Sequence, residues 1–358
     1  MTACDDCLRR TDLIAAIAGR LEIEFKQRTA PGRVLALPDD DLLAVGGTAD
    51  IARRYRRFDA PAARARASHA RLTTICRCRD AYPQRLLDLA DPPAVVHVLG
   101  DPGVLTVEDG VAIVGARRAS SYGLDVARAL GRGLSAAGVA VVSGLALGID
   151  SAAHAGALEA PGRTVGVLAG SADVPYPVRG WRLHAAVAAR GAVISEMPPG
   201  ANAYKWCFVA RNRIIAALGA ATLVVQATER SGSLTTADFA AELGRAVAAV
   251  PGQVTSRLSA GTHALILTGA PLIRDAADAL DVLAGATGRV FKDPSPPPPP
   301  KLAAPLARLL AAVEDGHGTL GELAATPDEA RAALSGLGQL EYLGLIRRGF
   351  AGRWERAA

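Results

Sequence analysis

Residues 111–150 read VAIVGARRASSYGLDVARALGRGLSAAGVAVVSGLALGID and decide the fold of this chain. An apolar run ends at a polar turn that begins with Gly115, and a second apolar run, residues 139–142, ends at Ser143 and Gly144. Between the two runs, apolar residues recur at helical spacing. The order strand, helix, strand predicts two parallel strands joined by a right-handed crossover.

The two turns also predict where a ligand would bind. In an open parallel sheet the ligand site lies beyond the carboxyl ends of the strands, so residues 115–121 and 143–150 should face one another across a cleft. Glycine and the backbone N–H groups at a helix start accept anions. The residues leave a second interpretation open, in which the glycines only permit tight turns. The predicted phosphate contacts are Gly115, Arg117, Ser143 and Gly144.

A nicotinamide dinucleotide is disfavoured as the ligand. The turn GARRASSYG, residues 115–123, is not a G-x-G-x-x-G sequence. The second strand ends in Ser143 rather than in the acidic residue that would hold the ribose hydroxyls. We therefore expect no nucleotide cofactor.

The strand–helix alternation continues along the chain and predicts an α/β fold with a doubly wound, mostly parallel sheet. The expected strands are residues 95–99, 164–168, 192–195, 222–226 and 246–250, and the expected helices are 179–190, 208–218 and 234–243.

A stretch of interleaved cations and aromatic rings follows the strand at 192–195. Residues 198–213 read PPGANAYKWCFVARNR, which begins as a proline and glycine loop. Cations follow phosphates and rings stack on bases, so this composition favours single-stranded nucleic acid. The alternative is that Trp206 and Phe208 are core anchors and that Arg213 pairs with a carboxylate. The predicted contacts are Lys205, Phe208, Arg211, Asn212 and Arg213.

A hydroxyl-rich turn, residues 229–235, precedes the expected helix at 234–243. Ser231, Gly232 and Ser233 are predicted to receive a phosphate on the N–H groups of this turn. A serine at this position can equally cap the helix, and the two roles are compatible.

Four motifs together resemble the DNA-processing protein A family: IVGARRASSYG at 113–123, VVSGLALGIDSAAH at 141–154, ARNRIIAALG at 210–219 and ERSGSLTTA at 229–237. The resemblance implies an extended Rossmann-like domain that binds single-stranded DNA and has no defined enzymatic reaction. It implies loading of the RecA recombinase on that DNA during recombination and natural transformation, and a homodimer with contacts near residues 261–266. The family's DNA contacts match Arg117, Lys205, Phe208 and Asn212.

Two departures from the family pattern lower the polarity of the site. Ala116 stands where a hydroxyl residue is usual, which removes one phosphate contact. Val209 and Ala210 stand where many members have proline and arginine, but the sequence Arg211-Asn212-Arg213 that follows is intact.

Composition agrees with an anionic partner. The chain of 358 residues has a formal net charge of +5, and half of its residues are apolar. Its start, MTACDDCLRR, is polar, and no apolar run approaches the length of a membrane span, so we expect a cytoplasmic protein. Five cysteines do not suggest a disulfide framework there.

Four domains or linkers are predicted from changes in composition: a small helical domain at 1–80, the DNA-binding domain at 81–290, a polyproline linker at 291–300, and a winged-helix-like domain at 301–358. The last segment predicts three helices and a hairpin. Its arginines suit DNA, although a protein-interaction or structural role is equally compatible.

Four cysteines predict a structural zinc site. Cys4 and Cys7 are separated by two residues, and Cys76 and Cys78 by one. Four thiolates can hold a tetrahedral zinc ion, which would stabilise a small helical domain with little core of its own. The alternative is four unlinked, reduced cysteines.

Two other functions remain open from the residues. Asp150 and His154 are spaced i, i+4, so they could serve as an acid–base pair of an enzyme that acts on a nucleotide in the same cleft. A helix-start carboxylate and an interior histidine would show the same spacing. The C-terminal domain could instead make the protein a sequence-specific regulator.

Overall fold

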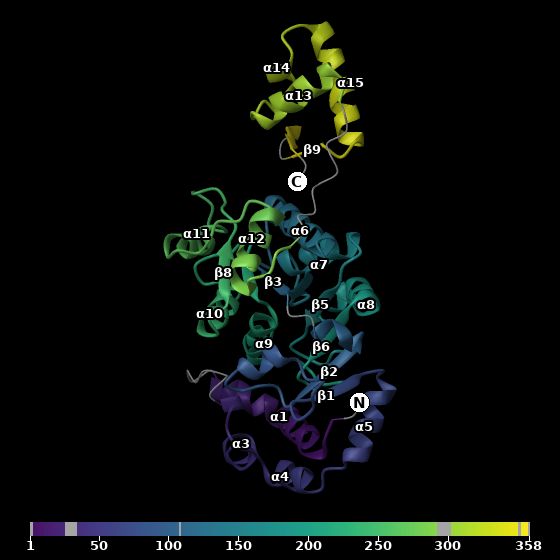
Figure 1. The fold of residues 1–358 in the computed structure, drawn as a ribbon, viewed down its shortest axis with the longest axis vertical. Helices are drawn as coiled ribbons and strands as arrows, with labels where there is room; N and C mark the ends of the chain where they lie inside the picture. Colours follow the sequence, from purple (N-terminus) through teal and green to yellow (C-terminus); the bar gives the residue numbers. More distant parts are fainter. Residues whose placement is uncertain (1–2, 26–33, 107–108, 292–301, 350–351, 357–358) are drawn as a thin grey trace. The chain divides into compact units, whose positions relative to one another are not determined.

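The structure is a computed structural model, which describes residues 3–25, 34–106, 109–291, 302–349 and 352–356. By its internal contacts the chain forms two compact units, Met1–Pro294 and Ser295–Ala358. Each unit has a hydrophobic core of its own. Figure 1 draws the backbone of both units as a ribbon.

The first unit is built on one sheet, to which the described residues contribute eight strands in the order β1-β2-β6-β5-β4-β3-β7-β8. Neighbouring strands from β6 to β8 are parallel, whereas β2 is antiparallel to β1 and to β6. The doubly wound, mostly parallel sheet is thereby confirmed. The strands are β1 (Thr73–Cys76), β2 (Val95–Gly100), β3 (Gly110–Val114), β4 (Ala140–Ser143), β5 (Thr164–Val167), β6 (Ala192–Ser195), β7 (Ala221–Val224) and β8 (Ala246–Ala249).

Helices cover both faces of the sheet because successive strand residues point to opposite faces. Val111 and Ile113 of β3 pack against α6 (Ser121–Ala136), α7 (Ile149–Glu159) and α12 (Ala276–Thr287). Ala112 and Val114 pack on the other face, against α9 (Lys205–Leu218) and α10 (Leu234–Glu242). Helices α8 (Trp181–Arg190) and α11 (Ala260–Leu267) also belong to this unit.

Helix α6 shows why the central strand–helix–strand unit folds as expected. The Ser120 hydroxyl accepts a hydrogen bond from the backbone N–H of Gly123 and caps the helix start. At its other end Gly138 has a φ of +81°, a value that glycine adopts without strain, and Val139 donates to the carbonyl of Leu134. This C-terminal turn directs the chain into β4.

The N-terminal helices are α1 (Asp5–Phe25), α3 (Asp39–Gly46), α4 (Ala49–Arg56) and α5 (Ala60–His69), and they lie beside the β1 and β2 end of the sheet (Figure 1). Leu13, Ile17 and Leu21 of α1 share a core with Met197 and Trp206. The expected helical segment 1–80 also contributes a strand, β1, which the sequence pattern did not predict. The boundary near residue 80 stays a prediction.

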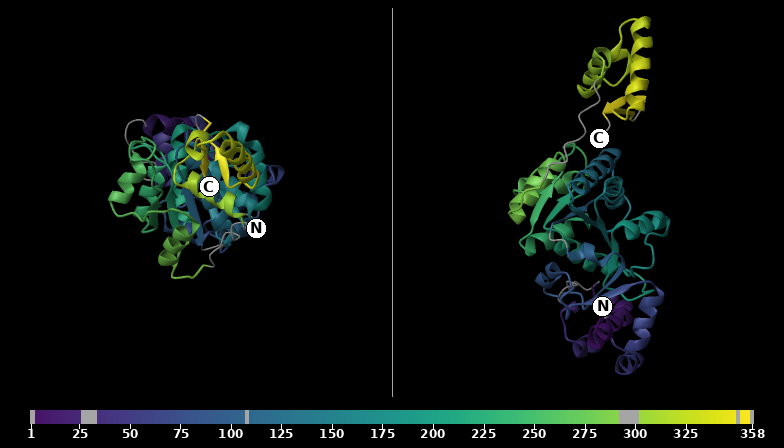
Figure 2. Two further views of the ribbon diagram at one scale, coloured as in Figure 1. Left: turned by 90° about the horizontal axis from the view of Figure 1, so that it is seen from above. Right: turned by 45° about the vertical axis from the view of Figure 1, so that its right-hand side comes forward.

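The second unit contains α13 (Ala304–Glu314), α14 (Leu320–Leu323), α15 (Pro327–Tyr342) and a hairpin of β9 (Ile346–Arg348) and β10 (Trp354–Arg356), visible in the right-hand view of Figure 2. Leu337, Leu340, Ile346 and Trp354 form its core. The expected helices and hairpin are thereby confirmed. The predicted polyproline linker lies outside the described residues except for Phe291. Among the described helices, none has the length and apolarity needed to span a lipid bilayer.

Candidate nucleic-acid interface

The order of the strands places a crevice beside β3. From β3 the chain proceeds through β4, β5 and β6 on one side, and then returns to β7 and β8 on the other. Such a reversal opens a ligand site at the carboxyl ends of the central strands. A cavity of about 320 Å³ lies there. Its lining includes the predicted contacts Gly115, Arg117, Phe208, Arg211, Asn212, Ser231, Gly232 and Ser233.

A cation and a ring stand together at this cavity, and a second ring lies against the first. The guanidinium carbon of Arg117 lies 5.1 Å from the centroid of the Phe208 ring. The Tyr176 ring lies on the same phenylalanine, with centroids 5.1 Å apart and planes inclined at 51°. Arg117 is exposed, whereas Phe208 is half-buried because part of its ring packs on the core shared with α1. The arrangement offers a charge and a ring face to one ligand.

Arg211 lies at the base of the cavity and is 5% exposed. Its Nη1 donates to the carbonyl of Gly144 at 2.7 Å and also to that of Val167, whereas its Nε has no hydrogen-bond partner among the described residues. A Cβ at Gly144 would overlap Nη1 of Arg211, so any larger residue there would displace the guanidinium from its position. Burial lowers the pKa of Arg211 to about 10, and the nearby Asp150 partly opposes that shift.

Asp150 also lines the cavity, but His154 does not share its surroundings. Burial raises the pKa of Asp150 to about 6, although Arg211 and backbone N–H groups partly offset the effect. His154 is fully buried, its Nδ1 lies 2.7 Å from the Thr164 hydroxyl, and burial lowers its pKa to about 3. The structure therefore supports the interior-histidine interpretation, because the two side chains do not face a common substrate.

Two predicted contacts have structural roles that keep their side chains from the cleft. Arg213 is 1% exposed, and its guanidinium bonds to Asp91 at 2.9 Å and Glu196 at 2.8 Å. The carboxylate-pairing alternative thus describes Arg213 correctly. The buried hydroxyl of Ser143 donates to the carbonyl of Ile113 at 2.6 Å and joins β4 to β3.

Gly144 helps to form a cavity wall, but its N–H is not available to bind an anion. Its N–H donates to the Asp150 carboxylate at 3.1 Å, so this donor is already used within the protein. The residue instead lines a smaller cavity adjacent to the first, again beside Arg117 and Arg211.

The hydroxyl-rich turn is tied to α9 by Asn212. The Asn212 amide donates to the carbonyl of Gly232 at 3.1 Å and to the Thr235 hydroxyl at 2.8 Å. The hydroxyls of Ser231 and Ser233 lie 2.7 Å apart, and neither is used as a side-chain cap of α10. Both serines line the cavity, so the position of this turn is compatible with the predicted phosphate contact.

Helix α9 begins at Lys205, three residues before the expected start at Phe208. The cause lies in α1: the Glu22 carboxylate accepts the N–H of Trp206 at 3.1 Å, and the indole of Trp206 donates to the carbonyl of Ala18 at 2.9 Å. Trp206 is thus a core anchor, as one alternative proposed. Lys205 is exposed on the first helical turn, outside the residues that line the main cavity.

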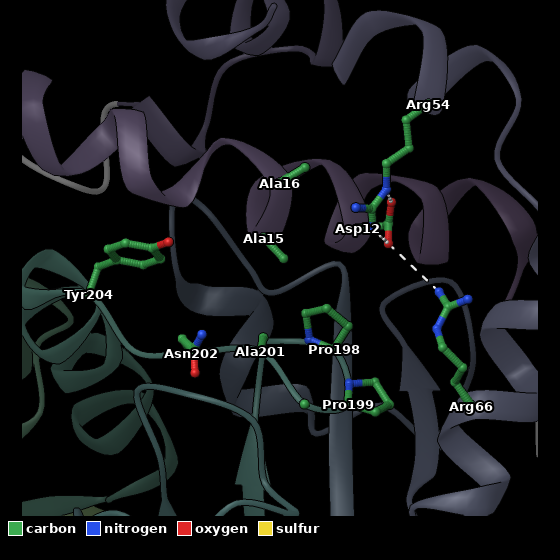
Figure 3. A pocket seen from close by; sticks show the side chains of 11 residues that line it. Asp12, Ala15, Ala16, Arg54, Arg66, Pro198, Pro199, Ala201, Asn202 and Tyr204 are labelled. Carbon is green, nitrogen blue, oxygen red and sulfur yellow. Dashed lines mark hydrogen bonds and ion pairs between the residues drawn. The ribbon is translucent and has the colours of Figure 1, made fainter. Parts of the chain in front are cut away.

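A separate hollow of about 250 Å³ separates the N-terminal helices from the segment 198–204 that leads into α9 (Figure 3). Asp12 lies between Arg54, at 2.6 Å, and Arg66, at 3.8 Å. Because the Asp12 carboxylate partly neutralises these two arginines, the net positive charge of the hollow is smaller than that of two cations. The sequence offered no signal for this contact, since the partners come from separate helices.

The four predicted cysteines are brought together at the edge of the sheet. Cys4 and Cys7 lie at the start of α1, Cys76 ends β1, and Cys78 follows in the next turn. Their sulfur atoms all lie within 4.8 Å of one another, and those of Cys7 and Cys78 are 3.6 Å apart. Four thiol groups at this separation can hold a metal ion.

Sequence reasoning missed Tyr176, which lies in the segment between β5 and α8. The signal was present in residues 174–182, VPYPVRGWR, where rings alternate with prolines and arginines. No local pattern pairs this segment with Phe208, and only the fold places the two rings together.

Known proteins resemble this chain over the same region. A "Putative DNA processing protein DprA" from Mycobacterium tuberculosis strain CDC 1551 is 43% identical over 254 residues, which are 70% of this chain and 64% of that protein. The DNA processing protein DprA of Bacillus subtilis is 40% identical over 212 residues, or 59% of this chain and 71% of that protein. The chain therefore spans slightly less than two thirds of the mycobacterial relative.

Two solved structures agree with the fold. The X-ray structure of DNA processing protein A from Streptococcus pneumoniae gives a TM-score of 0.63 at 32% identity and covers 78% of this chain and 98% of that one. The structure of DNA processing protein A from Helicobacter pylori is described for its single-stranded DNA binding mode. It gives a TM-score of 0.55 at 30% identity, and the match covers 61% of this chain and 98% of that one. The sequence pattern of "DNA recombination-mediator protein A" matches residues 73–284. This chain belongs to the DNA recombination-mediator protein A family, the DprA/Smf proteins.

Proposed function

We propose that this protein binds single-stranded DNA across the carboxyl edge of its sheet and loads a RecA recombinase onto that DNA during recombination and natural transformation. The observation that carries the proposal is the cavity beside β3, where Arg117 lies over Phe208 and Arg211 forms the base. The Helicobacter pylori relative, described for its single-stranded DNA binding mode, supports it.

Unpaired bases suit this site better than a duplex does. A base can stack on the exposed part of the Phe208 ring only when it is free of its pairing partner, and its phosphate can then reach Arg117. The proposed contacts are Gly115, Arg117, Gly144, Lys205, Phe208, Arg211, Asn212, Ser231, Gly232 and Ser233.

Binding rather than catalysis is proposed for the cavity. Asp150 is a carboxylate that lines it, but its Oδ2 accepts a backbone N–H, and His154 is buried against Thr164. An acid–base mechanism needs both groups within reach of one substrate, which this arrangement does not provide. The nucleotide-enzyme alternative is therefore the weaker one.

A homodimer through α11 is proposed from the family segment at 261–266. Leu267, at the end of this helix, is 86% exposed, and Leu272 just beyond it is 45% exposed. Large apolar side chains that are exposed in a single chain can be covered by a second copy. Light scattering on the wild type and on Leu267→Arg tests this: a monomeric wild type contradicts the dimer.

We also propose that the four-cysteine cluster holds a structural zinc ion. Zinc prefers four thiolates in a tetrahedron, and the sulfur atoms of Cys4, Cys7, Cys76 and Cys78 lie close enough to provide it. A bound ion would join the start of α1 to the end of β1, which is the outermost strand of the sheet.

A competition titration tests the proposed DNA function. We expect the full chain to bind single-stranded oligonucleotides in preference to duplexes of equal length, with affinity that falls as salt rises. Free nucleotides should compete poorly. RecA filament assembly on single-stranded DNA should be faster when this protein is added. Equal affinity for duplex and single strands contradicts the stacking account, and unchanged filament assembly contradicts the loading role.

A further inference from the structure

The segment that runs from β5 into the first turn of α8 exposes an unusual number of apolar side chains within a few residues. Val174 is 44% exposed, Tyr176 48%, Val178 78% and Trp181 55%. Single exposed apolar residues are normal on a protein surface, but a contiguous group marks an interaction site. We call residues 174–182, VPYPVRGWR, the aromatic strip.

The aromatic strip is continuous with the proposed DNA site. Tyr176 and Pro177 line a second cavity, of about 90 Å³, whose walls include Arg117, Phe208 and Arg211 of the first cavity. The remaining lining is mainly apolar, from side chains such as Leu168. The two cavities thus share one ring and two cations, and Tyr176 lines the second cavity but not the first.

The shared residue Arg211 retains an unused donor. Its guanidinium is almost completely buried between the two cavities, and its Nε has no partner among the described residues. Because Arg211 lines both cavities, its positive charge is available to both of them. This observation is independent of the exposed rings, and it favours an anionic ligand such as a phosphate.

Cations alternate with the rings along the aromatic strip. Arg179 is exposed, and the guanidinium carbon of Arg182 lies 5.3 Å from the centroid of the Trp181 ring. A purely apolar protein partner would not select this alternation, whereas single-stranded DNA matches it, because its phosphates need cations and its bases need ring faces.

We propose that the aromatic strip is a second stacking track for single-stranded DNA, in which Tyr176 receives the base next to the one on Phe208 and Trp181 receives a base farther along the strand. This inference rests on the proposed function, because the strand must already occupy the cavity at Phe208. It adds Tyr176 and Trp181 to the binding residues and makes the site longer than one cavity.

The first test uses the full chain and oligothymidylates of about 4 to 16 nucleotides, which is the range of site sizes of small single-strand-binding folds. Trp181→Ala should weaken binding of the long oligonucleotides about five- to hundredfold and leave the shortest ones unchanged. Tyr176→Ala should weaken binding at shorter lengths as well, because its ring adjoins Phe208. Trp181→Phe should keep most of the affinity.

The second test uses tryptophan fluorescence. The chain has three tryptophans, and Trp206 and Trp354 are only 4% and 6% exposed, so acrylamide should quench mainly Trp181. Long oligothymidylates should change the emission and protect it from acrylamide. The shortest oligonucleotides should not protect it, and Trp181→Phe should remove the response.

The outcomes separate the two ideas. If the wild type does not bind single-stranded DNA, the proposed function fails and this inference fails with it. If the wild type binds and Phe208→Ala weakens binding, but Tyr176→Ala and Trp181→Ala bind every length as the wild type does, only the aromatic strip is refuted. Both rings are about half exposed, so melting temperatures near that of the wild type are expected and should be verified first.

Discussion

Arg117 lies over the ring of Phe208, with its guanidinium carbon 5.1 Å from the ring centroid, and so connects the turn after β3 to α9. At an exposed position such a contact contributes about 0.5–1 kcal/mol. Its main effect is therefore on geometry: it holds a cation and a ring side by side before any ligand is present. The two side chains should contribute differently to DNA binding.

Arg117→Ala should weaken binding to single strands of every sequence and make the salt dependence shallower, by about 0.7 in log–log slope for one lost phosphate contact. Phe208→Ala should cost about 1–3 kcal/mol of binding free energy with little change in slope, because stacking releases no counterions. Fluorescence anisotropy over a salt series measures both effects.

Arg118→Ala is the matched control for this pair, since Arg118 is the adjacent exposed arginine but lies outside the residues that line either cavity. It should change affinity less than Arg117→Ala does. A Phe208→Ala protein that loses about 3–5 kcal/mol of stability, while its folded fraction binds normally, would show that this ring is only a core residue.

Arg213→Ala should affect stability and not the binding site. It would leave Asp91 and Glu196 buried without their cation, which should cost about 3–5 kcal/mol of unfolding free energy. Arg132→Ala, which breaks a surface ion pair with Glu159, should cost less than about 1 kcal/mol. Denaturant titration measures both. If the Arg213→Ala protein has normal stability but no longer binds DNA, Arg213 is a DNA-binding residue after all.

Affinity for single-stranded DNA should increase as the pH falls toward about 6 and should level off below it, since Asp150 lines the cavity with a pKa raised to about 6 by burial. A phosphate nearby would raise that pKa further. By linkage, binding then takes up a proton, so this carboxyl can increase affinity by at most about tenfold for each pH unit of acidification. Asp150→Asn should bind single-stranded DNA more tightly at neutral pH, and its affinity should lose the part of the pH dependence that comes from this carboxyl. If the pH profile of this variant is the same as that of the wild type, the effect belongs to other groups.

Freshly purified, reduced protein should contain about one zinc ion per chain. Cys4→Ser combined with Cys7→Ser should abolish the metal, and a chelator should lower the melting temperature of the wild type, because the ion joins α1 to β1. Cys207→Ala, at the buried fifth cysteine in α9, is the control and should retain the metal. Elemental analysis that finds no zinc in the wild type refutes the site.

The sequence alone determined most of the first unit's architecture. Apolar runs, glycine turns and helical spacing depend on neighbours in the chain, so the strands near 111–114 and 139–142 and the helix between them could be read directly. The cysteine spacing likewise predicted a cluster that the fold does assemble. The anion-binding turns pointed to the correct edge of the sheet, because parallel strands place their carboxyl ends together.

Tertiary structure decided which of the candidate side chains face the cavity. Arg211 and Arg213 are two residues apart and look alike in sequence, yet one lines the cavity and the other is enclosed by Asp91 and Glu196. The start of α9 depends on Glu22, which accepts the N–H of Trp206 from 184 positions away. Burial, ion pairing and capping by distant segments have no local sequence pattern, since each depends on which surfaces the completed sheet brings together.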